Sequence, residues 1–362
     1  MRLRRILLKN FRNLREVELL PAEGYNLLLG ANAAGKTNLC EAIYYASRGE
    51  LLKGERQREL LRWGERWTVI ELEVDRDHLR IVLDGDERTK RVEVNGKPER
   101  PGRLSDYLRA VAFTADDLQV IKGRPSTRRR LLDSMIAELD PEYRFHWRRY
   151  ERVLRGKNLL LRQGSPDREL LAVYQQELIE LGAALVARRL SYLRQVNEEL
   201  RAIHGRLEVG RGPLQLDYLP SIPYLPEDTE ELEGWLAAGV EAKAEEERRR
   251  GFSIVGPHRD DLQFISGGID LGRFGSQGEQ RLAMIQLKLA QLELHRRRFS
   301  QYPILILDDL LSELDPRWGQ LLLEALPSGI QAFLTATELR PPLRKLGCRV
   351  YLVEDGRVRE GL

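Results

Sequence analysis

Two kinds of hydrophobic pattern alternate along the chain and divide it into three stretches. In residues 1–124, short runs such as LRRILLKNF and WTVIELEVD place an apolar residue at nearly every second position, which is typical of half-buried β-strands. Between residues 125 and 250 the apolar spacing becomes helical, and the longest such segment reads LAVYQQELIELGAALVARRLSYLRQVNEEL. After Gly251 strand-like runs return, among them PILILDD, IQAFLTA and CRVYLVEDGRV. The pattern therefore predicts sheet, then helices, then sheet again.

Strand-like stretches at both ends of the chain favour one α/β domain assembled from the two ends. We expect this domain to comprise residues 1–124 and 251–362, and residues 125–250 to form a helical insertion subdomain. Prolines at positions 213, 220, 223 and 226 interrupt the helical pattern of the insertion. In the first stretch, Asn95-Gly96 predicts a tight hairpin turn, because both residues adopt positive φ readily.

The composition is that of a globular protein with a substantial core, since 42% of the 362 residues are hydrophobic and 32% are charged. No uncharged apolar run approaches ~18 residues, so we expect no membrane-spanning helix and no membrane partner. The basic N-terminus lacks the long apolar core and the cleavage site of a secretory signal. Two cysteines fit a reducing compartment, and these features together favour a cytoplasmic protein.

The net charge of +3 conceals a separation of charge within the helical stretch. Arg128 to Arg168 holds eleven basic and six acidic residues, whereas Glu208 to Glu247 holds two basic and eleven acidic residues. Contact with DNA phosphates requires a basic surface of this kind, and a stable arginine-rich surface is the alternative explanation. The net charge alone gives no indication of nucleic-acid binding, but the distribution of charge is compatible with it.

A phosphate-binding loop is the most specific motif in the sequence. Residues 30–37 match G-x-x-x-x-G-K-[ST] and lie between the strand-like run YNLLL and the amphipathic segment NLCEAIYYAS. Glycines allow the backbone to wrap around phosphates, and the following helix presents its positive N-terminus to them. Lys36 would supply positive charge to the outer phosphates of ATP, and Thr37 a hydroxyl ligand for Mg²⁺. The loop consists of Gly30, Ala31, Asn32, Ala33, Ala34, Gly35, Lys36 and Thr37.

Two aspartates that follow a strand-like run complete the predicted nucleotide site. In YPILILDD the apolar run ends at Asp308 and Asp309, where ligands converge at the carboxyl edge of a parallel sheet. Asp308 would hold Mg²⁺, and Asp309 stands where a general base for an attacking water is expected. Either aspartate alone would more simply be a helix cap, but the preceding loop favours the catalytic interpretation.

Further motifs give the chain a family resemblance. Phe274 to Arg281 reads FGSQGEQR, and Leu311 to Asp315 reads LSELD; these resemble the signature motif and the D-loop of ABC-type ATPases. Within that group the chain resembles the bacterial RecF family, which is related to the SMC and Rad50 heads. The residues that carry this narrower resemblance are the opening LKNFRN, Asp117 to Pro125, Arg128-Arg129, Leu132-Asp133 and Gly256 to Leu262.

The resemblance implies an ABC-type P-loop ATPase head that binds ATP and Mg²⁺ and forms a head-to-tail homodimer around two nucleotides. Ser276, Gln277 and Gly278 would then reach across to the γ-phosphate held by the partner subunit. Ser312 and Asp315 would contact the same site and couple the two subunits. Ser276 also begins a helix-like segment, so an ordinary helix cap is the simpler alternative for that residue.

Three departures from the family pattern suggest slow hydrolysis. The residue after Asp308 is Asp309, where ABC heads usually have a longer glutamate. The run LRAVAF is followed by Thr114-Ala115-Asp116, without the usual metal-contacting glutamine. The usual switch histidine is absent from FLTATEL, which leaves Thr335 or Thr337. A further pair, His258-Arg259, is as compatible with a hydrogen-bonded turn as with a role in the site.

The candidate DNA contacts are the arginines Arg128, Arg129, Arg130, Arg148 and Arg149. Aromatic residues lie among them, and stacking on the bases of a single-strand end is one interpretation. However, Tyr143, Trp147 and Tyr150 fall on one helical face, which is more typical of a core. We therefore favour sequence-independent contact with the duplex backbone.

The sequence leads us to expect an ATP-dependent DNA-binding clamp of recombinational repair. It would bind double-stranded DNA near single-strand gaps and junctions, assist recombinase loading, and hydrolyse ATP weakly with stimulation by DNA. The family resemblance adds RecR and RecO as partner proteins. The alternative is the nucleotide-binding subunit of an ABC transporter. A long-armed chromosome-structuring protein is excluded, because two helical arms of about 60 residues each reach at most ~90 Å.

Overall fold

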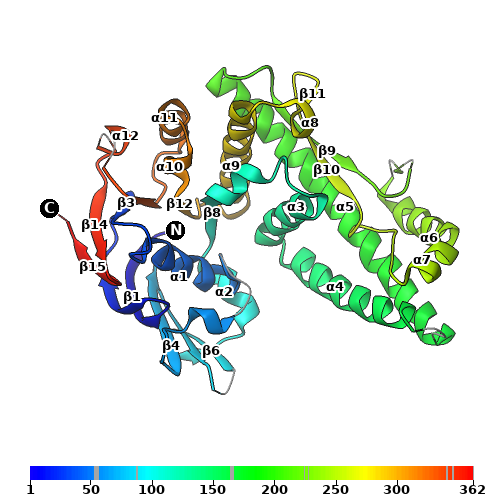
Figure 1. Cartoon of the computed structure of the whole chain (residues 1–362), viewed down its shortest axis with the longest axis horizontal. Coiled ribbons are helices and arrows are strands. Elements are labelled where there is room, and N and C mark those ends of the chain that lie inside the picture. Colours follow the sequence, from blue (N-terminus) through cyan, green and yellow to red (C-terminus); the bar gives the residue numbers. More distant parts are fainter. Residues whose placement is uncertain are drawn as a thin grey trace. The chain divides into compact units, whose positions relative to one another are not determined.

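The computed structural model describes the chain except for residues 53–56, 87–88, 164–166, 224, 227, 340, 345 and 362. The described chain divides into two compact units (Figure 1). Unit 1 comprises Met1–Asp117 and His295–Leu362, and unit 2 comprises Leu118–Leu294.

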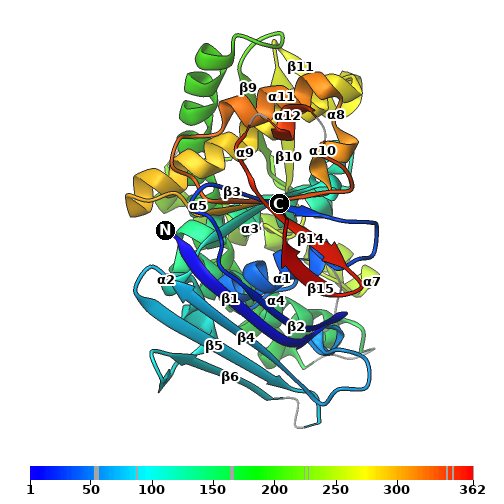
Figure 2. The same cartoon turned by 90° about the vertical axis from the view of Figure 1, so that its left-hand side faces the viewer.

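Unit 1 contains two six-stranded sheets. The first sheet is antiparallel, in the order β2-β1-β4-β5-β6-β7, and its strands lie side by side in Figure 2. The second has the order β15-β14-β3-β13-β12-β8; all its neighbouring strands are parallel except β15. The strands are β1 (Leu3–Phe11), β2 (Leu14–Leu19), β3 (Tyr25–Leu29), β4 (Trp67–Val74), β5 (Asp77–Asp84), β6 (Thr89–Val94), β7 (Lys97–Pro98), β8 (Ala110–Thr114), β12 (Ile304–Asp308), β13 (Ala332–Ala336), β14 (Arg349–Glu354) and β15 (Arg357–Glu360).

Helix α1 (Lys36–Arg48) joins the cores of the two sheets. Its side chains Leu39 and Ile43 are fully buried in one cluster with Ile6 of the antiparallel sheet and Ile306 of the parallel sheet. The helix that follows the predicted phosphate loop therefore packs into the same apolar core as both sheets. The other helices of unit 1 are α2 (Leu104–Tyr107), α10 (Leu310–Glu313), α11 (Pro316–Ala325), α12 (Pro341–Arg344), and the 3₁₀ turns η1 (Gln57–Leu60), η2 (Pro101–Arg103) and η3 (Ala115–Gln119), the last of which ends in unit 2.

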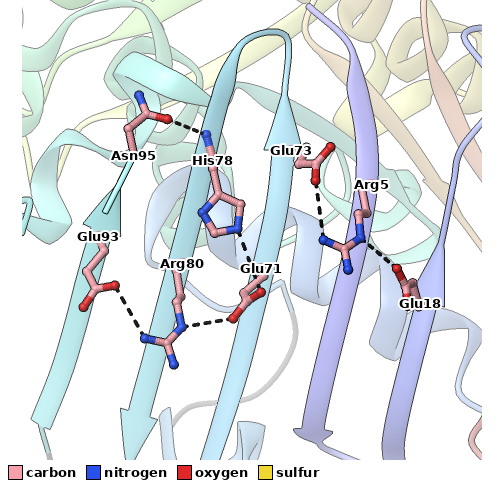
Figure 3. Close-up of polar contacts among 8 residues, drawn as sticks. All are labelled: Arg5, Glu18, Glu71, Glu73, His78, Arg80, Glu93 and Asn95. Carbon is pink, nitrogen blue, oxygen red and sulfur yellow. Dashed lines mark hydrogen bonds and ion pairs between the residues drawn. The ribbon is translucent and has the colours of Figure 1, made fainter. Parts of the chain in front are cut away.

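The outer face of the antiparallel sheet carries ion pairs between neighbouring strands (Figure 3). Arg80 on β5 lies between Glu71 on β4, at 3.0 Å, and Glu93 on β6, at 3.5 Å. Arg5 on β1 similarly contacts acidic residues on β2 and β4. Each of these arginines already has carboxylate partners, so this face is poorly suited to binding phosphates.

Unit 2 combines helices with a three-stranded antiparallel sheet of order β11-β10-β9. Helices α3, α4 and α5 pack on one another, and α3 and α5 also contact strands of this sheet. The elements are α3 (Pro125–Leu139), α4 (Pro141–Leu161), α5 (Arg168–Leu207), β9 (Leu214–Leu219), η4 (Thr229–Glu231), α6 (Leu232–Ala242), α7 (Ala244–Arg250), β10 (Asp261–Ser266), β11 (Ile269–Asp270), α8 (Leu271–Phe274) and α9 (Gln277–Phe299), whose last residues belong to unit 1.

A buried arginine connects the elements of unit 2. Arg189 on α5 pairs with Asp133 on α3, with nitrogen–oxygen distances of 2.9 and 3.0 Å, and it also donates to the Pro257 carbonyl oxygen at 2.8 Å. Tyr143 on α4 donates to the same aspartate, and the Tyr218 hydroxyl on β9 lies within hydrogen-bond distance of the guanidinium. A buried charge requires such partners, so this network specifies how these helices meet the sheet.

The units divide at different positions from those that the sequence pattern predicts. We expected residues 1–124 and 251–362 to belong to the α/β domain, but residues 118–124 and 251–294 lie in unit 2. For residues 251–294 the reason is that β10 pairs with β9 over six residues, from Asp261↔Leu219 to Ser266↔Leu214. The strand-like pattern after Gly251 therefore contributes to two different sheets. The predicted hairpin is present, with φ of 52° at Asn95 and 74° at Gly96.

Helix α5 is long and apolar enough to cross a membrane by length and composition alone. Core helices pass the same test, which makes it weak evidence for a membrane span. Its residues Val186, Val196 and Leu200 are fully buried within the protein.

Candidate nucleotide-binding site

The predicted nucleotide-binding residues of unit 1 meet at one edge of the parallel sheet. Strands β3, β13 and β12 are parallel neighbours, so their carboxyl ends lie at the same edge. Gly30 follows β3, Asp308 ends β12, and Thr335 lies near the end of β13. The Gly30 N–H donates to the Ala336 carbonyl oxygen at 3.2 Å, which ties the start of the phosphate loop to β13.

Both glycines of the phosphate loop are required by the backbone around them. A Cβ on Gly30 would lie 2.2 Å from the carbonyl oxygen of Val353, which is closer than any side chain tolerates. Gly35 has a φ of 119°, and a Cβ there would lie 2.8 Å from Asn13 Oδ1. The loop residues Ala31, Asn32 and Ala33 between them are exposed, and Ala34 is partly so. The backbone at the two glycines is thus tightly packed, while the loop between them is accessible to solvent.

Asn13, which lies outside the motif, stabilises the phosphate loop by hydrogen bonds. Its Nδ2 donates to the carbonyl oxygens of Ala33 and Ala34, at 3.3 and 3.1 Å, and its Oδ1 accepts from Asn38 on α1 at 2.7 Å. The preceding residue, Arg12, forms an ion pair with buried Glu41 on the same helix. The segment LKNFRN therefore supports the loop and α1, a role that its sequence alone does not reveal.

Lys36 is held at the loop rather than directed into solvent. Its Nζ donates to the carbonyl oxygens of Gly30 and Ala31, both at 2.8 Å, and only 4% of the residue is exposed. At the start of α1, Gly35 provides no side-chain cap, and no acidic residue occupies the first turn. Positive charge and a helix N-terminus therefore coincide, as an anion site requires.

Thr37 and Asp308 lie together as the sequence predicts for a magnesium site. Thr37 Oγ1 donates to Asp308 Oδ1 at 2.8 Å, and Asp308 is completely buried. Two oxygen donors fit Mg²⁺, which takes only one or two protein ligands when substrate phosphates and waters supply the rest. No group of three or more His, Cys, Asp or Glu that could hold a metal occurs in the described part of the chain.

Thr335 connects the two aspartates. Its Oγ1 accepts from the Asp309 N–H at 2.7 Å and lies 3.2 Å from Asp308 Oδ1 and 3.3 Å from Asp309 Oδ1. Asp309 itself has a φ of 52°, an uncommon value for a residue with a side chain. Of the two threonines that stand in place of the usual histidine, Thr335 makes this contact, whereas Thr337 lines the adjoining pocket.

An open pocket of about 430 Å³ lies over these residues. Its lining includes the loop residues Asn32, Gly35 and Lys36, together with Asp309 and Ser312. Ser312 Oγ donates to the Asp309 carbonyl oxygen at 2.7 Å, so the D-loop is bonded to the predicted catalytic residue. Asp315 is exposed at the start of α11. The pocket is polar and large enough for a nucleotide triphosphate moiety.

The signature residues Ser276, Gln277 and Gly278 belong to unit 2; Ser276 directly precedes α9, and Gln277 is its first residue. Ser276 Oγ accepts from the Glu279 N–H at 3.3 Å, and Glu279 Oε2 accepts from the Ser276 N–H at 2.8 Å. This reciprocal pair is a capping box, which satisfies N–H groups that helix ends leave unpaired. The Ser276 backbone bond is also the main reason that the pKa of Glu279 lies below its usual value. Ser276 therefore caps α9, and Gln277 beside it is exposed.

The five candidate arginines in unit 2 differ in their surroundings. Arg128 makes a two-bond pair with Asp261, at 2.9 and 2.6 Å, and Arg129 donates to the Asp260 carbonyl oxygen at 2.7 Å. Burial lowers the pKa of Arg129. The remaining three are exposed on α3 and α4: Arg130, Arg148 and Arg149. Arg149 is paired with Glu177 at 2.5 Å.

The aromatic face among these arginines belongs largely to the core. Tyr143 and Tyr150 are buried, and Trp147 is half-buried. Tyr143 additionally takes part in the Arg189 network through Asp133. These side chains are therefore occupied within unit 2, which favours the core interpretation over stacking on bases.

His258 and Arg259 form a hydrogen-bonded turn. His258 Nε2 lies 3.1 Å from the Ser253 carbonyl oxygen, and Nδ1 lies 2.7 Å from the Tyr150 hydroxyl oxygen. Arg259 donates to the same carbonyl, at 3.0 and 2.7 Å. Burial lowers the pKa of His258 to about 3, so the ring is neutral at physiological pH. These bonds give the pair a structural role.

Comparison with known proteins links the chain to one family. Residues 2–338 match the family model described as "RecF/RecN/SMC N terminal domain". The DNA replication and repair protein RecF of Desulforamulus reducens is 36% identical over 343 residues, which are 93% of this chain and 92% of the relative. RecF of Symbiobacterium thermophilum is 37% identical, over 91% of this chain and 89% of the relative.

Solved structures extend the likeness to the fold. A structure described as the recombination mediator protein RecF–ATPrS in the RecFOR pathway superposes with a TM-score of 0.90 at 29% identity, covering 100% of this chain and 98% of the other. The SMC head domain of Pyrococcus furiosus, bound to the C-terminal domain of ScpA, gives a TM-score of 0.54 at 17% identity. It covers 99% of this chain and 95% of the other, and supports the ABC-type head fold alone.

Proposed function

Because the chain belongs to the RecF family of DNA replication and repair proteins, we propose that it is an ATP-dependent DNA-binding clamp of recombinational repair. ATP would induce a head-to-tail dimer that binds duplex DNA near single-strand gaps and assists recombinase loading. The observation that carries the proposal is the contact of Thr37 with Asp308 beside a pocket that the phosphate loop lines. Slow hydrolysis of ATP would release the clamp.

ATP binding rests on the phosphate loop. The Lys36 ammonium and the start of α1 attract the β- and γ-phosphates, and the accessible loop backbone supplies further N–H donors. Thr37 and Asp308 would hold Mg²⁺, which neutralises phosphate charge when it is bound. Such proteins use nucleotide chiefly to shift a conformational equilibrium, because γ-phosphate contacts exist in only one of the states.

Hydrolysis requires a group that orients and deprotonates water, and Asp309 lines the pocket for this role. Thr335 binds the Asp309 backbone and approaches its carboxylate, so it is a positioning residue. Aspartate is one methylene shorter than glutamate and reaches less far toward a water. We therefore infer slow turnover, with stimulation by DNA through closure of the dimer.

The second half of each site would come from the partner subunit. Ser276, Gln277 and Gly278 at the N-terminus of α9 would contact the γ-phosphate across the interface, because a helix start with a hydroxyl makes an anion site. Ser312 and Asp315 would meet the partner at the same place. The bond from Ser312 to Asp309 supports this coupling, because it connects the D-loop to the candidate base.

DNA would be held through its backbone, without sequence readout. Arg130, Arg148 and Arg149 are the more exposed of the five candidates for phosphate contacts, whereas Arg128 and Arg129 are more buried within unit 2. Arg149 would have to exchange its ion pair with Glu177 for a phosphate. RecO and RecR are proposed as partner proteins, since the similar RecF structures are described as part of the RecFOR pathway. A cytoplasmic location completes the proposal. Full-length similarity to RecF proteins counts against an ABC transporter subunit.

Sedimentation with and without ATP tests the proposal. The wild-type chain is expected to dimerise only with ATP, and Lys36→Ala to remain monomeric because the phosphates lose their cation. Asp309→Asn should bind ATP and stay dimeric, since it keeps the loop and loses the base. A wild-type chain that stays monomeric in both conditions would refute the clamp.

A further inference from the structure

Two groups share the carboxylate of Glu279, which lies in the first turn of α9. Its Oε2 accepts from both the N–H and the hydroxyl of Ser276, each at 2.8 Å. Its Oε1 forms an ion pair with the guanidinium of Arg211, a residue 68 positions earlier in the chain. The signature serine is therefore positioned by an acid whose charge is balanced by an arginine.

Arg211 lies in the loop between α5 and β9, and the backbone of that loop is fixed. Ser266 Oγ donates to the Gly212 carbonyl oxygen at 2.9 Å. Gly267 has a φ of 56°, and a Cβ on it would lie 2.9 Å from Arg211 Cβ. A Cβ on Gly210 would lie 3.0 Å from the Leu282 side chain on α9. The loop therefore rests against α9 and β10, while more than half of the Arg211 side chain is exposed.

A negative charge in this turn has two opposing effects. It stabilises the helix, because the N-terminus of α9 is positive and the capping box satisfies its N–H groups. However, the same turn is where the proposed function brings the γ-phosphate of a nucleotide held by a second copy. An unbalanced carboxylate would repel that phosphate, and it would also retain the Ser276 proton that the phosphate needs.

We propose that Arg211 is a positioning residue of the signature motif: it neutralises Glu279, so that Ser276 and the start of α9 accept the γ-phosphate of ATP bound to a second copy of this chain. The inference rests on the proposed function and adds to it a residue outside the motif. It also explains how an acid is tolerated beside an anion site.

The test compares dimerisation of Arg211→Ala, Glu279→Gln and the double variant by analytical ultracentrifugation, with Mg²⁺ and a non-hydrolysable ATP analogue. Arg211→Ala should weaken the ATP-dependent dimer about tenfold, because the carboxylate is then unbalanced. The double variant should recover to within about threefold of wild type, because glutamine keeps the capping oxygen without the charge. Arg201→Ala, which removes another exposed arginine of unit 2, should match wild type.

Binding of the analogue to the monomer, followed by fluorescence, should be unchanged in every variant because the phosphate loop lies in unit 1. If Arg211→Ala dimerised with ATP as strongly as wild type, the inference would be overturned and the proposed function would stand. A double variant as weak as Arg211→Ala would also overturn it, and would leave Arg211 with a structural role. A wild-type chain that never dimerises with ATP would overturn both proposals.

Discussion

At the scale of single residues, the nucleotide site depends on short polar contacts around two aspartates. Asp308 is buried, and its oxygen faces the hydroxyls of Thr37 and Thr335, at 2.8 and 3.2 Å. Thr335 also accepts from the Asp309 N–H. One hydroxyl therefore orients the candidate metal ligand and the candidate base together, and its removal should affect hydrolysis more than nucleotide binding.

Thr335→Val is expected to lower the ATPase rate about tenfold, because Asp309 loses its positioning bond and a buried polar group loses its partner. Nucleotide affinity should change by less than about threefold, since the phosphate loop is unaffected. A steady-state ATPase assay with a nucleotide titration measures both quantities. Thr335→Ser keeps the hydroxyl and should approach wild type. An equal loss in affinity and rate would contradict the positioning role.

At the scale of elements, support for the phosphate loop comes from the first turn of the antiparallel sheet. Asn13, between β1 and β2, bonds to two loop carbonyl oxygens and to Asn38 on α1. In unit 2, the turn that contains His258 similarly connects α4 to the segment before β10, through Tyr150 and Ser253. Removal of the first connection should change nucleotide affinity, and removal of the second should change the pH dependence of stability.

Asn13→Ala should weaken ATP binding by about three- to tenfold, because each hydrogen bond removed is worth roughly 1 kcal/mol and the loop becomes less ordered. Isothermal titration with an ATP analogue measures the change. Asn95→Ala, at the tip of the β6–β7 hairpin in the same unit, is the control and should leave the affinity unaltered. Unchanged affinity in Asn13→Ala would show that the loop holds its shape without this residue.

Stability should fall on acidification because of His258. Burial lowers its pKa from 6.5 to about 3, so folding favours the neutral ring. The resulting stabilisation is complete above pH 6.5 and is lost as the pH falls toward 3. Between neutral pH and about pH 5, the free energy of unfolding should decrease by about 2 kcal/mol more in wild type than in His258→Gln. Urea titrations at both pH values measure the difference, and equal pH dependence would contradict the assignment.

At the scale of the whole molecule, arginines are numerous but only some are suited to DNA. On the outer face of the antiparallel sheet, Arg5 and Arg80 lie between glutamates (Figure 3). Arg128 is partly buried beside Asp261 within unit 2, and Arg130 and Arg148 are exposed on helices. A net charge of +3 therefore says little about where phosphates would bind.

The double variant Arg130→Glu/Arg148→Glu reverses the charge at two exposed positions. It should bind duplex DNA more weakly and with a smaller dependence on salt. The slope of log affinity against log salt should become shallower by about one for each DNA phosphate that the variant no longer neutralises. Fluorescence anisotropy with a gapped duplex, from about 50 to 200 mM salt and with or without ATP, measures this slope. Arg80→Ala should behave as wild type. An unchanged slope in the double variant would place the DNA-binding surface elsewhere.

The sequence by itself determined the local features of this protein. The phosphate loop, the strand before Asp308, the Asn95-Gly96 turn and the long helices of unit 2 follow from the spacing of apolar residues and the backbone preferences of glycine and asparagine, which act over a few residues. The motifs that carry the resemblance to the RecF family are of the same kind.

Only the tertiary structure decided which distant residues meet. Parallel pairing of β3, β13 and β12 brings Thr335 to the aspartates, and the turn after β1 brings Asn13 to the phosphate loop. Pairing of β10 with β9 assigns residues 251–294 to unit 2, and the fold pairs Arg128 with Asp261, 133 positions later in the chain. Strand order, register and ion-pair partners depend on contacts between residues far apart in the chain, which a local pattern does not encode.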